Sequence, residues 1–306
     1  MRIIIAGGTG LIGQALINAF KEKHDITVIT RNVEKAKKIL SGVDSISWDS
    51  PMLEKAFEAS QLVINLVGEN ISSSRWSQRV KNKIIDSRAY ATHKICDVCL
   101  ALPPEKRPRL MNASAIGIYG IQTTLEQQQQ VTYTEESLIP EPSNDFLSYV
   151  GCQWEERLDK AKELSIIKLR FGVVLSPQGG MLAKLLPSFK LGLGGRIGSG
   201  SQPISWIAID DVVGVIAYLM EREELTGAFN LVAPQVLSQY EFARTLAKKL
   251  KRPCIFPLPA WVVKLLFGQM GEELLLSGQR VASMRLNEYS FTYPCLKQAL
   301  AAWHFQ

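Results

Sequence analysis

Short apolar runs alternate with longer stretches of helical periodicity through the first 175 residues of this 306-residue chain. The short runs are typical of strands buried on both faces of a parallel sheet. Between them, apolar positions recur every three or four residues, as on one face of a helix. We expect strands at residues 1–6, 25–30, 46–48, 61–68, 109–115 and 165–171, and helices at 11–20, 51–59, 78–102 and 146–164. This alternation predicts an α/β fold with a doubly wound parallel sheet, the Rossmann arrangement.

A polar stretch at residues 120–142 interrupts this alternation and contains four consecutive glutamines. We expect a mobile surface loop there. Asn144 and Asp145 follow it, and their side chains can cap the helix that begins near Phe146.

The pattern changes after Gly172, where a turn at 177–180 precedes a short helix at 181–191 and a glycine-rich segment at 192–200. No buried strand precedes these glycines, so we interpret the segment as a mobile loop over a binding site. Further on we expect a helix that follows residues 206–213 and runs to about Glu221, a strand at 228–231 that returns to the sheet, and helices at 238–250 and 260–267. Asp210 or Asp211 is expected near the cap of the first of these helices.

Three glycines, Gly7, Gly10 and Gly13, connect the first strand to the first helix. Such a turn leaves helix N–H groups unpaired and places the positive end of the helix dipole where a pyrophosphate can bind. The first glycine permits the turn, the second lets the backbone approach the ligand, and the third lets the helix pack closely on the strand. Because a second strand ends at the expected distance, the spacing predicts a dinucleotide-binding site.

The end of the second strand bears on which dinucleotide is bound. Sites specific for NAD place Asp or Glu there to bind the ribose 2′-hydroxyl, whereas this strand ends Thr30-Arg31-Asn32. A carboxylate would repel a 2′-phosphate, and a guanidinium pairs with it through two hydrogen bonds. We therefore predict NADP as the cofactor, with Arg31 at its 2′-phosphate. The alternative is that Arg31 is a solvated surface arginine.

Composition and charge argue against several other classes of protein. The chain is 46% hydrophobic and 21% charged, which is ordinary for a globular protein. Its formal net charge of +6 comes from basic residues scattered along helices, so we expect no nucleic-acid partner. No apolar run reaches transmembrane length and the chain opens on a strand, so we expect a cytoplasmic protein with no membrane partner.

The five cysteines and three histidines lack the spacing of a disulfide framework or a metal site. An odd number of cysteines suits a reducing compartment. Cys96 and Cys99 form a CxxC sequence, but it lies within a helical pattern and has no second pair of ligands. His24, His93 and His304 are far apart in the sequence, and we expect no metal.

Several segments together resemble the extended or atypical short-chain dehydrogenase/reductase superfamily over nearly the whole chain. They are Gly7-x-x-Gly10-x-x-Gly13, Asn65-Leu66-Val67-Gly68-Glu69, Ser114-x-x-x-x-Tyr119-Gly120, Leu169-Arg170-x-x-Val173-Val174-Leu175 and Trp206-Ile207-x-Ile209-Asp210-Asp211-Val212. Within it, the chain resembles epimerase-like proteins with a C-terminal domain of unknown function, sometimes labelled cell-division-inhibitor-like (SulA-type). That narrower resemblance rests on Gly68-Glu69-Asn70-Ile71, Arg75-Trp76, Ser87-Arg88, Ala115-x-Gly117-x-Tyr119-Gly120, the glycine-rich segment 191–200 and Gly278-Gln279-Arg280.

The resemblance implies a nicotinamide cofactor and a set of residues that bind it. Thr9, Leu11 and Ile12 would cover the pyrophosphate, Arg31 would meet the 2′-phosphate, Trp48 and Asp49 would lie near the adenine, Leu66, Val67 and Gly68 would run beneath the ribose, Arg170 would lie beside the nicotinamide, and Glu69 and Arg88 complete the set. We divide the chain accordingly into an NADP-binding Rossmann domain, residues 1–174 and 205–232, and a substrate or cap domain, residues 175–204 and 233–306.

Short-chain dehydrogenases usually work with Ser, Tyr and Lys, in which Lys four residues after Tyr lowers the pKa of the phenol. Ser114 fits the serine position and is our candidate to polarise a substrate oxygen. Aligning the family's helix on Glu155 places Leu147 and Gly151 at the Tyr and Lys positions, and neither can transfer a proton. Tyr149 keeps the four-residue spacing to Gln153, but a shift of two residues turns it by about 200° around the helix.

Other side chains near these motifs are weaker candidates. Tyr119 could reach a substrate if its loop folds over the site, or it is a packed aromatic residue. Glu69 and Arg75 could face the cleft, or they form a cap and surface pair. Cys152 could serve as a thiol nucleophile, but no histidine lies nearby in the sequence and burial is the simpler interpretation.

Two functional hypotheses from different classes follow. The first is an NADP(H)-dependent oxidoreductase or epimerase-like enzyme that acts on a small molecule through Ser114. The second is a non-catalytic protein that senses NADP or binds a partner linked to cell division, which the missing Tyr and Lys favour. An isomerase that needs no NAD would rest on fold analogy alone. Relatives pair through the helices expected here at 78–102 and 146–164, which implies a possible homodimer.

Overall fold

The computed structural model describes residues 1–141 and 145–305. Its centre is a sheet of seven parallel strands, in the spatial order β10 (Gly227–Leu231), β6 (Ile166–Phe171), β5 (Arg109–Ala115), β4 (Leu62–Asn65), β1 (Arg2–Ala6), β2 (Asp25–Thr30) and β3 (Asp44–Ser47). The order of the strands reverses between β1 and β4, the switch point at which doubly wound sheets bind ligands. The predicted fold class is confirmed.

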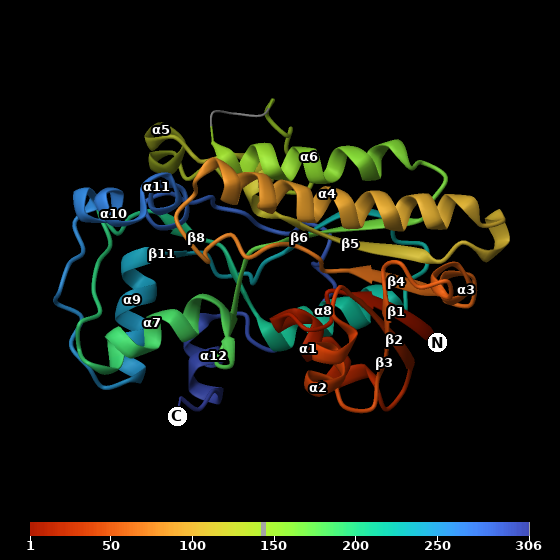
Figure 1. Cartoon of the computed structure of the whole chain (residues 1–306). Coiled ribbons are helices and arrows are strands. Elements are labelled where there is room, and N and C mark those ends of the chain that lie inside the picture. The colour runs from red at the N-terminus through yellow and green to blue at the C-terminus, as the bar shows by residue number, and fades with distance from the viewer. Residues whose placement is uncertain (142–144, 306) are drawn as a thin grey trace.

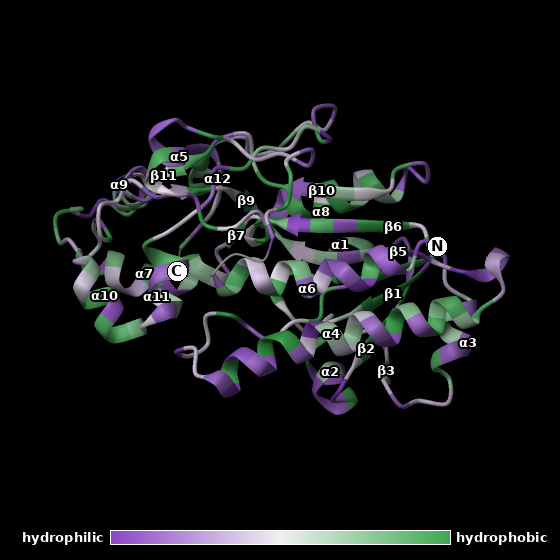
Figure 2. Ribbon diagram, turned by 90° about the horizontal axis from the view of Figure 1, so that it is seen from above, coloured by the Kyte–Doolittle hydropathy of each residue, from purple (hydrophilic) through white to green (hydrophobic). Residues whose placement is uncertain are grey.

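Helices cover both faces of this sheet (Figure 1). One core cluster joins the sheet to α1 (Leu11–Phe20), α2 (Val33–Ile39) and α8 (Ile209–Met220). The other joins it to α3 (Leu53–Glu58), α4 (Gln78–Ala101) and α6 (Phe146–Lys160). Alternate residues of β1 point to the two clusters, so both faces of the strand are apolar. Figure 2 shows hydrophilic and hydrophobic residues mixed along α4 and α6, as amphipathic helices require.

A third core cluster holds the shorter elements that lie beyond the carboxyl ends of the strands. Its helices are α7 (Gly180–Lys190), α9 (Gln239–Lys249) and α12 (Leu296–Ala302). Two pairs of short strands accompany them, β7 (Val173–Ser176) with β9 (Trp206–Ala208), and β8 (Pro203–Ile204) with β11 (Leu237–Ser238). The remaining helices are α5 (Thr124–Gln128), α10 (Ala260–Phe267), α11 (Gln269–Leu275) and the 3-10 turns η1 (Pro104–Lys106) and η2 (Ile116–Tyr119).

Several local predictions need correction. β3 ends at Ser47, so Trp48 follows the strand instead of closing it. The polar stretch at 120–142 contains α5, which begins with a capping box between Thr123 and Glu126. Asn144, expected as a cap, lies outside the described residues, while Asp145 caps α6 by accepting a bond from the Ser148 N–H at 2.7 Å.

Asp210 and Asp211 lie in the first turn of α8, close to its N-cap residue Ala208 as predicted, although no side chain makes a capping bond there. The buried Asp211 carboxylate instead accepts bonds from the backbone N–H groups of Thr292 and Tyr293, at 2.7 and 3.0 Å. Asp210 accepts a bond from the Trp303 indole at 3.2 Å. The two acids therefore tie the C-terminal segment to α8.

The glycine-rich segment at 192–200 lies beside residues 253–260 and not over the glycine turn of residues 7–13. Ile197 and Leu258 form a bridge, and a Cβ built on Gly195 would lie 1.9 Å from the Phe256 carbonyl oxygen. Close backbone packing is therefore one reason for glycine here.

No helix among the described residues combines the length and the apolar character needed to cross a bilayer. The predicted cytoplasmic location stays a prediction.

Candidate functional site

The turn between β1 and α1 needs glycine at two positions for different reasons. Gly7 has a φ of +85°, and a Cβ there would lie 2.9 Å from the Leu66 carbonyl group. A Cβ on Gly13 would lie 2.6 Å from the Gly7 oxygen, so α1 could not pack as closely on the turn. Gly10 differs, because its Cβ would meet only the Gly7 oxygen, at 3.3 Å. The space beside Gly10, where a side chain would stand, is therefore largely open. A backbone that approaches a ligand closely requires such open space.

The amino end of α1 is open to an anion. Gly10 is its N-cap, no side chain caps it, and its first turn contains no acidic residue. Gln14 orders the turn by donating a bond to the Thr9 carbonyl at 2.7 Å. Leu11 lies against Gly179, which brings the turn between β7 and α7 over this end of the helix. Unpaired N–H groups and the helix dipole together fit a pyrophosphate here, with Thr9, Leu11 and Ile12 around it.

Arg31 is exposed at the carboxyl end of β2, and the structure gives it no hydrogen bond or ion pair among the described residues. The next residue, Asn32, caps α2 by accepting a bond from the Lys35 N–H at 2.9 Å. The guanidinium is thus free to bind a phosphate, and no carboxylate stands at the end of this strand.

The residues expected near the adenine differ in exposure. Trp48 is buried among the side chains between the sheet and α4, and its ring meets Tyr90 edge-on at 5.8 Å. Asp49 is exposed. Trp48 therefore supports this corner of the site and offers little surface for stacking.

The turn after β4, residues 66–69, is held in place by hydrogen bonds with Asn65 of β4 and with two residues of α4. The Val67 N–H donates to the Asn65 side chain at 3.1 Å, and the Glu69 N–H donates to the Ser87 hydroxyl at 2.9 Å. Arg88 donates to the Glu69 carbonyl at 3.1 Å, and its guanidinium lies 3.0 Å from where a Cβ on Gly68 would be. Burial lowers the pKa of Arg88 to about 10, although the nearby Glu69 carboxylate opposes the shift. Arg88 is therefore charged at neutral pH and shapes this turn from behind.

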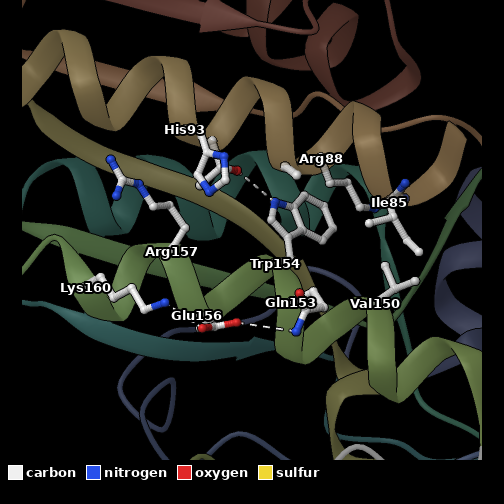
Figure 3. A pocket seen from close by; sticks show the side chains of 11 residues that line it. Ile85, Arg88, His93, Val150, Gln153, Trp154, Glu156, Arg157 and Lys160 are labelled. Atoms are coloured by element: carbon white, nitrogen blue, oxygen red, sulfur yellow. Dashed lines mark hydrogen bonds and ion pairs between the residues drawn. The ribbon is translucent and has the colours of Figure 1, made fainter. Parts of the chain in front are cut away.

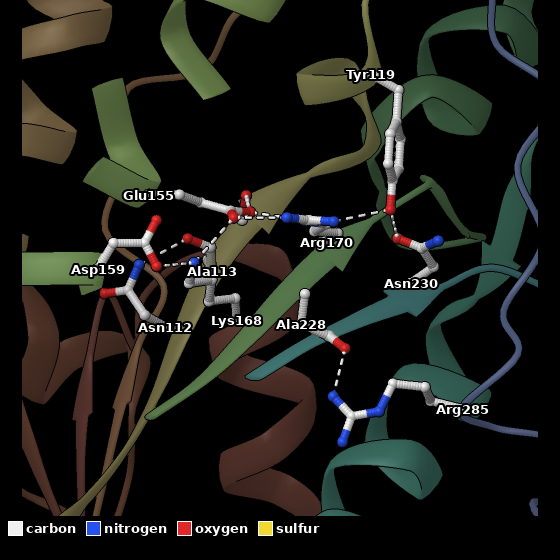
Figure 4. A network of polar contacts seen from close by, with 11 residues as sticks. Asn112, Ala113, Tyr119, Glu155, Asp159, Lys168, Arg170, Ala228, Asn230 and Arg285 are labelled. Carbon is white, nitrogen blue, oxygen red and sulfur yellow. Dashed lines mark hydrogen bonds and ion pairs between the residues drawn. The ribbon is translucent and has the colours of Figure 1, made fainter. Parts of the chain in front are cut away.

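A buried network of polar side chains lies where β5 and β6 end (Figure 4). The Glu155 carboxylate, from α6, accepts two bonds from Arg170, at 2.8 and 2.7 Å, and one from the Ser114 hydroxyl at 2.6 Å. Arg170 also donates to the Tyr119 hydroxyl at 2.8 Å, which in turn donates to the Asn230 side chain at 2.8 Å. The network thereby joins five elements, β5, β6, β10, α6 and η2, around the ion pair of Glu155 with Arg170.

The charges of this network are stabilised by one another. Burial raises the pKa of Glu155, but the bonds and charge of Arg170, with Lys168 and Ser114, outweigh it and leave the pKa below its usual range. Burial also lowers the pKa of Arg170, and its pairing with Glu155 more than reverses that shift. The pKa of Tyr119 is raised by burial despite the neighbouring Arg170. At neutral pH the network therefore holds a carboxylate, a guanidinium and a neutral phenol.

This geometry changes the roles expected of three residues. The side chains of Ser114, Tyr119 and Arg170 are almost fully buried, and their polar atoms bind protein partners. Tyr119 stacks on Tyr133 at 5.4 Å, which fits the packed-aromatic alternative. In this conformation the Ser114 hydroxyl donates its hydrogen bond to Glu155, so it shapes the end of β5 and is not free to polarise a substrate oxygen.

Our sequence reasoning missed Glu155 and Asn230 as partners in this network. The available signal was Arg170 itself, since an arginine inside an apolar strand needs a buried counter-charge. Nothing in the sequence indicates that Asn230, on β10, lies beside Tyr119.

The face of α6 that would carry the usual Tyr and Lys is packed against η2. The Leu147 Cβ lies 3.2 Å from where a Cβ on Gly117 would be, and a Cβ on Gly151 would lie 2.9 Å from the Ile118 Cα. Gly151 therefore leaves no room for a lysine. Glu273, from α11, accepts bonds from the Phe146 and Leu147 N–H groups, both at 3.0 Å. Tyr149 is exposed and points elsewhere, as predicted.

The remaining candidate residues lie in surroundings that suit a structural role. Burial raises the pKa of the Cys152 thiol, which disfavours a thiolate nucleophile. Arg75 lies against Gly268, between α10 and α11. Burial raises the pKa of Cys96 to about 11 and that of Cys99 to about 12. In the described part of the chain, no group of three or more His, Cys, Asp or Glu residues could hold a metal ion.

A cavity of about 260 Å³ lies between α4 and α6, away from the glycine turn (Figure 3). His93, Arg157 and Lys160 line it together with Trp154, whose indole donates to Thr92 at 3.2 Å. Arg157 pairs with Asp97, and Lys160 with Glu156 at 2.6 Å. Its basic side chains are thus largely satisfied within the protein.

Comparison with protein families matches nearly the whole chain. Residues 3–231 match the NAD dependent epimerase/dehydratase family, and residues 258–303 match a domain of unknown function, DUF1731. The chain is 34% identical over 311 residues to the epimerase family protein SDR39U1 homolog, chloroplastic, of Arabidopsis thaliana, covering 99% of this chain and 86% of that protein. It is 32% identical to the epimerase family protein YfhF of Bacillus subtilis, covering 98% and 97%.

Solved structures agree with these matches. The human epimerase family protein SDR39U1 (isoform 2), a structure with NADPH, superposes with a TM-score of 0.84 at 32% identity, covering 98% of each chain. A UDP-glucuronic acid 4-epimerase of Bacillus cereus has a TM-score of 0.77 at 17% identity, which shows the fold alone. The descriptions of these matches give the cell-division-inhibitor label no support.

Proposed function

Because this chain belongs to the NAD dependent epimerase/dehydratase family, with a DUF1731 domain at its C-terminal end, we propose that it binds NADP(H) and acts as an oxidoreductase or epimerase on a small molecule. The observation that carries the choice of NADP is Arg31, exposed and unpaired at the end of β2 where NAD-specific sites hold a carboxylate. The NADPH in the human relative supports the same choice.

Different residues of the chain bind different parts of this cofactor. Gly7, Gly10 and the open end of α1 receive the pyrophosphate, Arg31 receives the 2′-phosphate, and the turn at 66–69 lies beneath the ribose. A bound nicotinamide would supply hydride transfer. Arg170, Glu155 and Ser114 fix the ends of β5 and β6 against which its ring would rest.

Titration of the protein with NADPH and NADH tests this proposal. Replacing Arg31 with Ala should weaken NADPH binding about 10- to 100-fold, because a charged hydrogen-bond partner is worth about 1.5–3 kcal/mol. NADH binding should be nearly unchanged, since NADH has no 2′-phosphate. Lys37→Ala is a matched control on the same surface, because Lys37 already pairs with Glu34. Equal affinities of the unmodified protein for NADH and NADPH would contradict the choice of NADP.

A second candidate, a protein that holds NADP without transforming a substrate, is favoured by two observations. Ser114 and Tyr119 are committed to a buried network, and Gly151 excludes the usual lysine. Oxidation of NADPH with a panel of carbonyl compounds and nucleotide sugars separates the two. Turnover would support the enzyme, whereas tight cofactor binding without turnover across the panel would favour the second candidate. A homodimer through α4 and α6 remains part of the first proposal, and sedimentation checks it.

A further inference from the structure

The helix α10 lies at one end of the molecule (Figure 1), and large apolar side chains on it and on the segments beside it are exposed. On α10, Trp261 is 68% exposed and Leu265 is 65% exposed. The neighbouring segments add further exposed residues. The full set, which we call the distal patch, is Leu191, Leu193, Ile255, Phe256, Trp261, Leu265 and Leu266. Proteins rarely expose so many large apolar side chains together without a binding role.

Backbone hydrogen bonds hold two segments of the distal patch, residues 191–198 and 253–258, side by side. The Gly198 N–H donates to the Leu258 carbonyl at 2.9 Å, and the Leu258 N–H donates to the Arg196 carbonyl at 2.7 Å. A Cβ on Gly192 would lie 3.4 Å from Pro253. Since α10 begins two residues after Leu258, the glycine-rich segment runs beside the chain that leads into this helix.

The charges of these segments have a single sign. Residues 180–198 and 250–268 contain six basic residues and no acidic residue. The six are Lys184, Lys190, Arg196, Lys251, Arg252 and Lys264. Lys264 pairs with Glu272 on α11 and Lys184 donates to Ser72 outside these segments, but Lys251 and Arg252 have no ion pair among the described residues. The exposed apolar side chains are therefore accompanied by positive charge.

We infer that the distal patch docks on an anionic lipid surface. A tryptophan with exposed leucines suits insertion at the level of the headgroups, and the lysines and arginines suit their negative charge. A symmetric contact between two copies would bring these basic residues against one another, which is unfavourable. The sequence-based expectation of no membrane partner rested on the lack of a spanning segment, and interfacial docking needs none.

Co-sedimentation of the full chain with vesicles tests this inference. We expect binding to vesicles of phosphatidylcholine mixed with phosphatidylserine, little binding to phosphatidylcholine alone, and release as salt is raised. The pair Trp261→Asp and Leu265→Asp should abolish binding without unfolding the protein, because both residues are exposed. The pair Lys251→Glu and Arg252→Glu should weaken it at least about 25-fold, since each lost basic residue is worth about fivefold.

Tryptophan fluorescence gives a second readout. Of the six tryptophans, Trp48, Trp154, Trp206 and Trp303 are buried, Trp76 is half-buried against Phe146, and Trp261 is exposed. Quenching by brominated lipid should therefore report mainly on Trp261 and should largely disappear in Trp261→Phe, which keeps an apolar side chain. Leu138→Asp, at an exposed leucine outside the patch, is the matched control and should bind as the unmodified protein does.

Three results would overturn the inference. The first is no binding to anionic vesicles at low salt. The second is binding that the patch variants leave unchanged. The third is a dimer that the same variants dissociate while vesicles recruit no protein, which would make the patch a contact between two copies. None of these outcomes bears on NADP(H) binding, so this inference can fail independently of the proposed function.

Discussion

At the scale of single residues, the pairing of Glu155 with Arg170 is the costliest feature to disturb. Both side chains are almost fully buried, and each charge is compensated chiefly by the other. Removing one member of such a pair leaves an uncompensated charge in a medium that solvates it poorly. The pair therefore specifies how β6 and α6 meet, whatever its net contribution to stability.

Replacing Glu155 with Gln should lower the free energy of unfolding by about 3 kcal/mol, because Arg170 would keep its charge and lose its counter-charge. Denaturant unfolding measures this. Glu156→Gln is the matched control on the next residue, whose exposed carboxylate pairs with Lys160, and it should change stability by less than about 1 kcal/mol. Equal effects of the two substitutions would contradict the role given to the buried pair.

The same pair predicts a pH dependence. The pKa of Glu155 is lowered in the folded protein, so its contribution to stability is present above the unfolded pKa of about 4.3. That contribution is lost as the pH falls through the folded pKa. The difference in unfolding free energy between the unmodified protein and Glu155→Gln should thus shrink below about pH 4 and stay constant near neutrality. A difference that grows in acid would contradict the lowered pKa.

At the scale of elements, the glycines of the turn from β1 to α1 serve two different purposes. One allows close packing of the helix, and another leaves space for a ligand. Gly13 is needed because α1 crosses the turn at close range, and Gly10 is not crowded by protein. On α6, close packing at a glycine excludes a functional side chain. Gly151 lets η2 approach, so a lysine that would assist a catalytic phenol cannot be placed there.

Alanine at the two glycines of this turn should therefore have different effects. Gly13→Ala should destabilise the fold by about 1–3 kcal/mol, because its Cβ would collide with the Gly7 and Gly8 backbone. Gly10→Ala should leave stability within about 0.5 kcal/mol, since its φ of −77° suits alanine. Thermal unfolding measures both. Titration with NADPH should show weaker binding in Gly10→Ala despite its intact fold.

At the scale of the whole molecule, buried and half-buried carboxylates attach the C-terminal region to the sheet domain. Asp211 binds the backbone at Thr292 and Tyr293, and Glu273 binds the first turn of α6. Glu135 accepts bonds from the Asn230 and Met284 N–H groups, both at 2.9 Å. Each of these carboxylates accepts bonds from two backbone N–H groups, and Glu135 and Glu273 also accept one from a side chain, Ser283 and Gln269 respectively.

Replacing Asp211 with Asn should loosen this attachment. An amide NH₂ would face a backbone N–H donor, and the unfolding free energy should fall by about 1–3 kcal/mol. Limited proteolysis should then cleave sooner within residues 276–305. Asp210→Asn, at the exposed neighbour that accepts one indole bond, should cleave at the rate of the unmodified protein. Equal protection in both variants would show that Asp211 does not secure the segment.

The sequence alone determined the sheet, the glycine turn and the position of Arg31. These depend on local periodicity and on backbone conformations that particular residues permit, which neighbouring residues display directly. The missing lysine at Gly151 was also visible in the sequence, although its steric cause was not.

Only the tertiary structure decided what Ser114, Tyr119 and Arg170 do. Their roles depend on Glu155 and Asn230, which reach them from other elements, and a buried polar group takes its role from whichever partner satisfies it. Trp48, which was expected near the adenine, is buried, and Asp211, which lies near the N-cap of α8 as expected, binds a segment about 80 residues away in sequence. Contacts of this kind depend on how elements pack against one another, and local sequence patterns do not predict that packing.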